Sequence, residues 1–254
     1  MDKVYEMSEF ILENMRTDDG ANNLNRYIAA GFISRFFLNE GTWQYYHAQE
    51  GEDFCDEEHA KKYLELAVRA GDFVINSGKY SFGSTYKDLF ASMDLSGNPE
   101  VMMYRHYDAG LSITHCIGSY NSGSESETCV NLEFIKSYNC NDGLPMSLSK
   151  AADPKDPTEL SLAKLVKTRD PRFFESFYDR ANIKSESLIY SYKFSVRSAL
   201  DTYFATGKAP NEWTGKYNEN DAPIMRLGEV VLNWIEAKAV LAQMGGAAVT
   251  QADL

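Results

Sequence analysis

The sequence predicts a mostly α-helical protein, in which repeat-type helix pairs form a frame and a loop-rich insertion with short strands interrupts it. The first third of the chain and residues 221–246 carry apolar residues at three- and four-residue spacing, which is typical of amphipathic helices. Residues 79–220 instead carry repeated turn formers, such as Ser96-Gly97-Asn98-Pro99. The chain of 254 residues is 44% apolar and 24% charged, which is ordinary for a globular protein.

Two helices are expected at the N-terminal end. Residues 5–16 carry apolar side chains at helical spacing. Residues 22–38 are apolar around most of the helix circumference, which is typical of a buried helix. We expect Asn39-Glu40-Gly41 to end this second helix, and an acidic, aromatic loop to follow it as far as Cys55.

The clearest amphipathic helix is expected to begin after Asp56, whose carboxylate can cap backbone N–H groups. Its apolar stripe consists of Ala60, Tyr63, Leu64, Ala67, Val68, Gly71, Val74 and Ile75. Ser77-Gly78 then closes it. With the preceding helix it forms an antiparallel hairpin that resembles one tetratricopeptide-type unit. A lone hairpin cannot bury its apolar face, so further helices must stack on it.

The insertion shows only brief regular patterns. Residues 100–107 predict one strand, and the alternation over 188–196 predicts another that is half buried. Asp142-Gly143 predicts a turn, because glycine tolerates a positive φ angle. Arg169-Asp170-Pro171-Arg172 predicts a second turn, whose arginines pair with local acids.

Residues 221–246 predict a long helix with its start signal attached. Asp221 can cap it, and Pro223 suits its first turn, where a missing N–H costs nothing. Arg226 and Glu229 stand three residues apart, where they can form an ion pair. Gly245-Gly246 is expected to end the helix. The apolar stripe, which we expect to face the core, is Ile224, Leu227, Val231, Trp234 and Ile235.

Charge and cysteine usage exclude several classes of function. A net charge of −12 without a basic patch argues against a nucleic-acid partner and against anionic membrane surfaces. The sequence contains no run of 18 apolar residues, so it predicts no transmembrane helix.

The cysteines form no C-x-x-C pair, so a zinc ribbon is excluded. Cys129 and Cys140 either form a disulfide in an exported protein or are small apolar residues. The acidic stretch over 50–59 fits a solvated helix start better than a metal site, and no cofactor is expected.

Aromatic residues point to the binding of sugars. The chain has 16 tyrosines and three tryptophans, flat side chains with a polar group that can stack on sugar rings and hydrogen-bond their hydroxyls. Each single aromatic can equally well pack in the core. Trp213 and Tyr217 precede the last helix. The residues that we expect to bind ligand are Trp43, Tyr45, Tyr107, Tyr120, Asn121 and Tyr138.

Five segments together resemble the RagB/SusD family of nutrient-uptake outer-membrane lipoproteins of Bacteroidetes-type bacteria. They are residues 63–80 (YLELAVRAGDFVINSGKY), 86–90 followed by 98–102 (YKDLF and NPEVM), 141–145 (NDGLP), 169–173 (RDPRF) and 222–241, in the order that the family has them. The lipid-bearing N-terminal cysteine and the C-terminal continuation of the family are absent from this sequence. We therefore expect one SusD-like domain over 1–254, truncated at both ends and corresponding to the middle portion of a longer protein.

The resemblance implies a function as well as a fold. It implies a non-catalytic subunit on the extracellular face of the outer membrane that binds oligosaccharide or starch-like polysaccharide. This subunit would deliver sugar to a SusC-like TonB-dependent transporter. Residues 1–78 and 221–254 would form the helical frame, and 79–220 the ligand-facing insertion.

Two other functions stay open at this stage. A tetratricopeptide-type scaffold that binds a protein segment predicts helix pairs throughout, which the turn-rich middle of the chain argues against. A glycoside hydrolase predicts two converging acids. Glu229 and Glu236 have a suitable separation on one helix, but a neighbouring arginine favours an ion-pairing role for them.

Overall fold

The computed structural model describes residues 1–20, 22–122, 130–150, 161–183 and 188–253. Within these ranges the chain is mostly helical, with two pairs of short strands, which confirms the expected fold class. The chain divides into two compact units, which are described separately below. Unit 1 comprises residues 1–84, 95–105 and 223–254, and unit 2 comprises residues 85–94 and 106–222.

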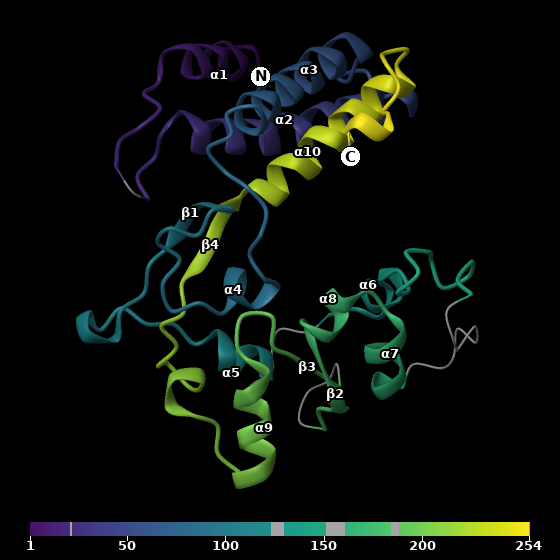
Figure 1. Cartoon of the computed structure of the whole chain (residues 1–254). Helices are drawn as coiled ribbons and strands as arrows, with labels where there is room; N and C mark the ends of the chain where they lie inside the picture. The colour runs from purple at the N-terminus through teal and green to yellow at the C-terminus, as the bar shows by residue number, and fades with distance from the viewer. Residues whose placement is uncertain (21, 123–129, 151–160, 184–187, 254) are drawn as a thin grey trace. The chain divides into compact units, whose positions relative to one another are not determined.

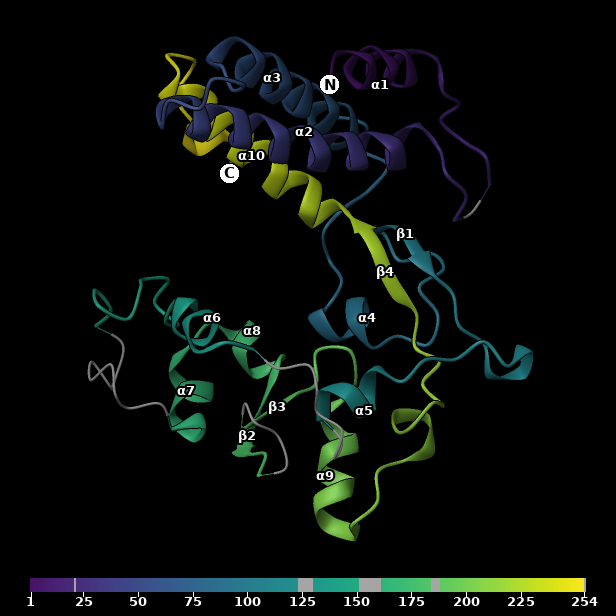
Figure 2. The ribbon, with the colours of Figure 1, turned by 180° about the vertical axis from the view of Figure 1, so that it is seen from behind.

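Unit 1 is built from long helices (Figure 1). They are α1 (Asp2–Asn14), α2 (Arg26–Gln49), α3 (Glu57–Ile75) and α10 (Leu227–Gln243). The strands β1 (Val101–Arg105) and β4 (Ala222–Arg226) pair with each other, and β4 runs directly into α10 (Figure 2). A short 3-10 turn, η3 (Gln251–Asp253), follows.

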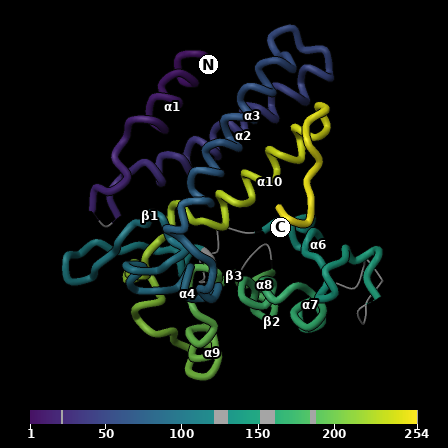
Figure 3. Tube along the Cα trace, turned by 45° about the horizontal axis from the view of Figure 1, so that its top comes forward, coloured from purple at the N-terminus to yellow at the C-terminus, as the bar shows by residue number. Residues whose placement is uncertain are grey.

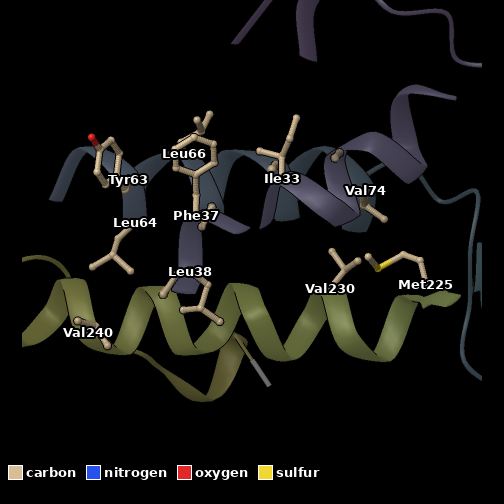
Figure 4. Packing of buried hydrophobic residues seen from close by; sticks show 14 of the residues in the cluster. Ile33, Phe37, Leu38, Tyr63, Leu64, Leu66, Val74, Met225, Val230 and Val240 are labelled. Atoms are coloured by element: carbon tan, nitrogen blue, oxygen red, sulfur yellow. The ribbon is translucent and has the colours of Figure 1, made fainter. Parts of the chain in front are cut away.

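The core of unit 1 lies between α2, α3 and α10. Phe37 of α2, Leu64 of α3 and Val230 of α10 are almost completely buried and belong to one cluster (Figure 4). The expected hairpin of α2 and α3 is therefore confirmed, and the last helix packs on it. Trp234 lies at this contact, where its indole N–H donates to Asp72 at 2.9 Å.

The end that we expected for α2 is wrong. The helix continues through Asn39-Glu40-Gly41 to Gln49, so Trp43 and Tyr45 lie on a helix rather than in a loop. Gly41 faces α3, where a Cβ atom would lie only 2.7 Å from Leu64 Cγ. This glycine permits close helix packing instead of ending the helix, since close-packed interiors leave no room for an extra methyl group.

The helix α3 is confirmed together with its cap. The Asp56 carboxylate accepts a hydrogen bond from the His59 backbone N–H at 2.7 Å. This bond and a second one from the His59 ring lower the pKa of Asp56, because both stabilise the ionised carboxylate.

The expected start of the last helix is also wrong. Residues 222–226 form β4, and α10 begins only at Leu227, whose N–H donates to the carbonyl oxygen of Glu100 at 3.0 Å. Arg226 does not pair with Glu229. Its guanidinium contacts the buried Glu100 carboxylate at 2.8 Å, while Glu229 accepts from Arg35 Nη2 at 2.8 Å. Pairing with β1 thus overrides the local helix-start signal. The end of the helix at the two glycines is confirmed.

Unit 2 consists of short elements. In chain order they are α4 (Tyr86–Phe90), η1 (Ala109–Leu111), α5 (Ile117–Ser122), α6 (Leu132–Ser137), α7 (Leu162–Thr168), α8 (Pro171–Phe174), β2 (Phe177–Ala181), β3 (Ile189–Ser191), α9 (Arg197–Thr206) and η2 (Asn211–Trp213). The helices α6, α7 and α8 gather beside β2 (Figure 3), where Ile135, Leu165 and Phe173 form a small core. A second small core contains Tyr178, Tyr190, Tyr192 and Leu200.

The short elements of unit 2 confirm some sequence expectations and correct others. The expected strand over 100–107 is present as β1 in unit 1, whereas that over 188–196 is confirmed only at β3, because a turn follows it before α9. Gly143 has a φ angle of +79°, as the expected turn requires. Arg172 pairs with Asp170, which caps α8.

Arg169 pairs with no acid among the described residues, contrary to expectation. It is buried, and its guanidinium donates to Met146 Sδ at 2.9 Å and to Cys140 Sγ at 3.2 Å. Cys140 is a free thiol; Cys129, the partner considered for it, lies outside the described residues.

The buried hydroxyl of Tyr178 predicts a loss of stability at alkaline pH. Burial, helped by the hydrogen bond to Asp201 at 2.5 Å, raises the pKa of Tyr178 to about 12. The folded state therefore holds this proton more tightly than the unfolded state does. The stabilisation that the protonated Tyr178 hydroxyl contributes should be complete below pH 10 and be lost between pH 10 and 12. The melting temperature should fall over that range, and by less in Tyr178→Phe. An equal fall in both proteins would contradict this role.

Candidate functional site

A run of buried polar residues directly precedes β4 and joins several segments of unit 2. The Asn218 side chain accepts from the Gly118 N–H at 2.9 Å and donates to the Glu212 carbonyl oxygen at 3.0 Å. Its backbone forms an isolated antiparallel bridge with His115. Asn218 thus fixes α5 and η2 next to each other. Gly118 permits this contact, because a Cβ atom there would lie 2.7 Å from the Trp213 carbonyl oxygen.

Asn220 connects two further segments of unit 2, those that carry Phe90 and Phe194. Its amide nitrogen donates to the carbonyl oxygens of Phe90 and Phe194, at 3.3 and 3.2 Å. The backbone carbonyl oxygen of Asn220 lies 3.0 Å from His115 Nε2, so the imidazole carries its proton on that nitrogen. Burial lowers the pKa of His115, which favours a neutral ring at pH 7.

Asp221 holds the segment that carries Tyr107. Its carboxylate is fully buried, and Oδ1 accepts from the Tyr107 N–H at 3.0 Å and contacts His106 Nδ1 at 2.9 Å. Its backbone N–H donates to Ser92 at 2.9 Å. The residue that resembled a helix cap is therefore a buried anchor for the segment that follows β1.

Five aromatic rings lie on the segments that these polar residues connect, and we call them the Asn218 cluster. The Tyr107 and His115 rings pack edge to face, with centroids 4.5 Å apart. Tyr120 on α5 is 38% exposed and Tyr217 is 58% exposed, so both rings can meet a ligand. The members are Tyr107, His115, Tyr120, Trp213 and Tyr217. Aromatic side chains fixed by a rigid polar support are suited to stacking on sugars, since little freedom is lost on binding.

Two of the six residues that we expected to bind ligand lie on segments that Asn218 and Asp221 hold. Tyr107 follows β1 and packs on His115, and Tyr120 lies on α5. Asn121 follows Tyr120 on α5, but its side chain lies outside the described part of the structure. Trp43 and Tyr45 both lie on α2 in unit 1.

The remaining three side chains have different surroundings. Trp43 is 51% exposed and stacks on His47, with centroids 3.8 Å apart. Tyr45 is only 7% exposed and belongs to the core of unit 1. Tyr138 packs edge to face on Phe173, and burial raises its pKa. Tyr45 and Tyr138 therefore have packing partners where a sugar would need an open ring.

Sequence reasoning missed the polar supports of the cluster. Asn218, Asn220 and Asp221 stand in a polar run that is typical of a loop or a helix cap. The available signal is their position directly before the apolar residues of β4, since a polar run that leads into a partly buried strand is itself a candidate for burial.

The described residues show neither a metal centre nor a membrane span. In the ranges that the structure covers, no three His, Cys, Asp or Glu side chains gather as metal ligands. Every helix there is too short or too polar to cross a bilayer. Glu229 forms its ion pair with Arg35, and Glu236 is exposed on α10.

Comparisons with known proteins identify the family. None of the curated proteins matches the chain. A solved crystal structure is similar, with 16% identity and a TM-score of 0.45 over 93% of this chain and 42% of that chain. The chain thus spans less than half the length of that protein. The model of the SusD family matches residues 89–252, which is more than half of the chain and includes the whole Asn218 cluster. The chain therefore belongs to the SusD family.

Proposed function

We propose that this chain is part of a nutrient-uptake protein that captures oligosaccharide or polysaccharide without cleaving it. Proteins of the SusD family generally bind glycans and are not enzymes. The observation that carries the proposal is the Asn218 cluster, where exposed aromatic rings stand on a buried polar support inside the matched region.

The capture would combine stacking with hydrogen bonding. The C–H faces of a sugar ring would lie on Tyr120 or Tyr217, and their hydroxyls and neighbouring polar groups would bond the sugar hydroxyls. Modest affinity suits this role, because a ligand that is held too tightly would not be passed on. Starch-like polysaccharide is the ligand that we propose to test first.

We also propose the place and the partner of this protein. As part of a lipid-anchored protein on the extracellular face of the outer membrane, it would deliver sugar to a SusC-like TonB-dependent transporter. In this arrangement residues 1–78 and 221–254 would serve as the frame, and 79–220 would face the ligand. Family membership supports this proposal at the level of the family.

Substitutions in the Asn218 cluster should weaken glycan binding. After a glycan array has identified a ligand, calorimetry should give about a twofold to tenfold higher Kd for Tyr120→Ala and for Tyr217→Ala, since one aromatic contact contributes about 0.5–1.5 kcal/mol. Both rings are exposed, so the fold should tolerate their removal. Phe54→Ala, which removes an exposed ring in unit 1, serves as a control and should bind as the parent does.

Other outcomes would separate the alternatives. Unchanged binding in both tyrosine variants, with a loss in Trp43→Ala, would move the site to α2. Release of reducing ends from the polysaccharide would contradict capture without cleavage and favour a glycoside hydrolase. Absence of binding to every glycan would overturn the proposed function and favour a helical scaffold for protein partners.

A further inference from the structure

A pocket of unit 2 combines aromatic rings with positive charge. It has a volume of about 220 Å³ and lies where the end of α8, the turn after β3 and the start of α9 meet α4. The side chains that matter for its chemistry are Tyr86, Lys87, Phe174, Lys193, Arg197 and Glu175. None of them belongs to the Asn218 cluster.

Two lysines in this pocket have no carboxylate partner. In the described part of the chain neither Lys87 nor Lys193 forms an ion pair, although the protein has 37 acids and 25 lysines and arginines. The Lys193 ammonium lies over aromatic rings, 4.4 Å from the Phe90 centroid and 5.5 Å from that of Tyr86. A ring face attracts a cation only weakly, so much of the charge is left for a ligand.

Arg197 adds a third, fixed cation. Its Nη2 contacts Asp179 at 3.0 Å, and its guanidinium lies over Phe174, 4.6 Å from the ring centroid. It is the first residue of α9, whose N-cap residue, Val196, supplies no side-chain cap. The first turn of α9 contains no acid of its own, so the positive end of the helix dipole adds to the positive charge of the pocket.

The acids near the pocket do not cancel this charge. Glu175 also lines the pocket, and Asp179 compensates Arg197. The two lysines thus face a single carboxylate, which leaves an excess of one positive charge in a protein of net charge −12. An anionic ligand is favoured at this place, although the chain as a whole repels it.

We propose that this pocket binds one sugar residue that carries an oxyanion, either a carboxylate or a sulfate. The proposal rests on the proposed function, since it assigns a class of glycan. The pocket lies below the range of about 300–1,000 Å³ that is usual for larger ligands, so it suits a single ring. Tyr86 and Phe174 would contact the ring, while Lys87 and Lys193 would bind the oxyanion through charge-assisted hydrogen bonds.

The test compares ligands that differ only in charge. Calorimetry at low salt would measure the binding of the whole chain to oligogalacturonate and to its methyl ester, and to a sulfated glycan before and after desulfation. The parent should prefer the charged member of one pair by about fivefold or more, as expected for two partly exposed cations. The pair that shows this preference identifies the oxyanion.

Variants then locate the preference. Lys87→Gln combined with Lys193→Met, which keeps the apolar stem over the rings, should abolish it. Glu175→Gln should raise the preference for the charged ligand by about twofold to fivefold, because it removes a negative charge that repels this ligand. A damaged fold cannot produce such a gain. Lys193→Arg keeps the positive charge and should largely retain the preference.

The possible failures are distinguishable. Equal binding of charged and neutral ligands, or a preference that survives the double substitution, overturns the acidic-sugar site while the proposed function stands. Absence of binding to all four ligands and to every neutral glycan overturns both.

Discussion

Replacing Phe37 by alanine should destabilise unit 1 by about 3–5 kcal/mol, the usual cost of truncating a fully buried phenylalanine. The Phe37 side chain has no exposed surface, and its ring packs against Tyr5 and Tyr63 at centroid distances of 5.9 and 5.5 Å. Truncation leaves a cavity between α2 and α3, because the close-packed neighbours can collapse into it only partly.

Urea unfolding followed by circular dichroism would measure this loss of stability. Phe36→Ala is a matched control, since Phe36 is the neighbouring residue, is 45% exposed and contacts the Phe37 ring from the surface. Its cost should stay below about 1 kcal/mol. Similar losses in the two variants would mean that the core of unit 1 does not lie between these helices.

The helices of unit 1 show which local signals suffice to predict an element. The sequence predicted α3 well, because the Asp56 cap, the apolar stripe and the acidic first turn agree with one another. The end of α2 was mispredicted, because Asn39-Glu40-Gly41 has the composition of a helix stop. Only the position of Leu64, which is distant in sequence, shows that Gly41 serves helix packing.

The candidate site was predictable only in part for the same reason. Composition pointed to aromatic residues, and Tyr107 and Tyr120 do lie on segments that the buried polar residues hold. Composition could not identify Tyr45 as a core residue, because an aromatic residue in a helix core and one at a binding surface can have the same local sequence. The role of Asn218 depends on segments about 100 residues away, and no local pattern records such contacts.

Asp221 provides the sharpest test of this long-range organisation. A helix cap at this position would predict that Asp221→Ala costs about 1 kcal/mol and frays the start of α10. The structure predicts a different result, since the buried carboxylate accepts from Tyr107 and contacts His106 instead. Its removal deletes the buried carboxylate that accepts from the partly buried Tyr107 N–H, so we expect a loss of about 1–3 kcal/mol.

The substitution should also weaken binding at the proposed glycan site, which the loss of a helix cap could not do. Without its anchor the Tyr107 segment would lose its position, so the Kd for glycan should rise by about twofold to tenfold, whereas the helix content should stay unchanged. Asp221→Asn retains an acceptor oxygen and should therefore cost about half as much. A drop in helix content with unchanged glycan binding would instead make Asp221 a helix cap. Coupled losses of stability and binding would show that this one buried carboxylate joins the fold to the proposed glycan-binding surface.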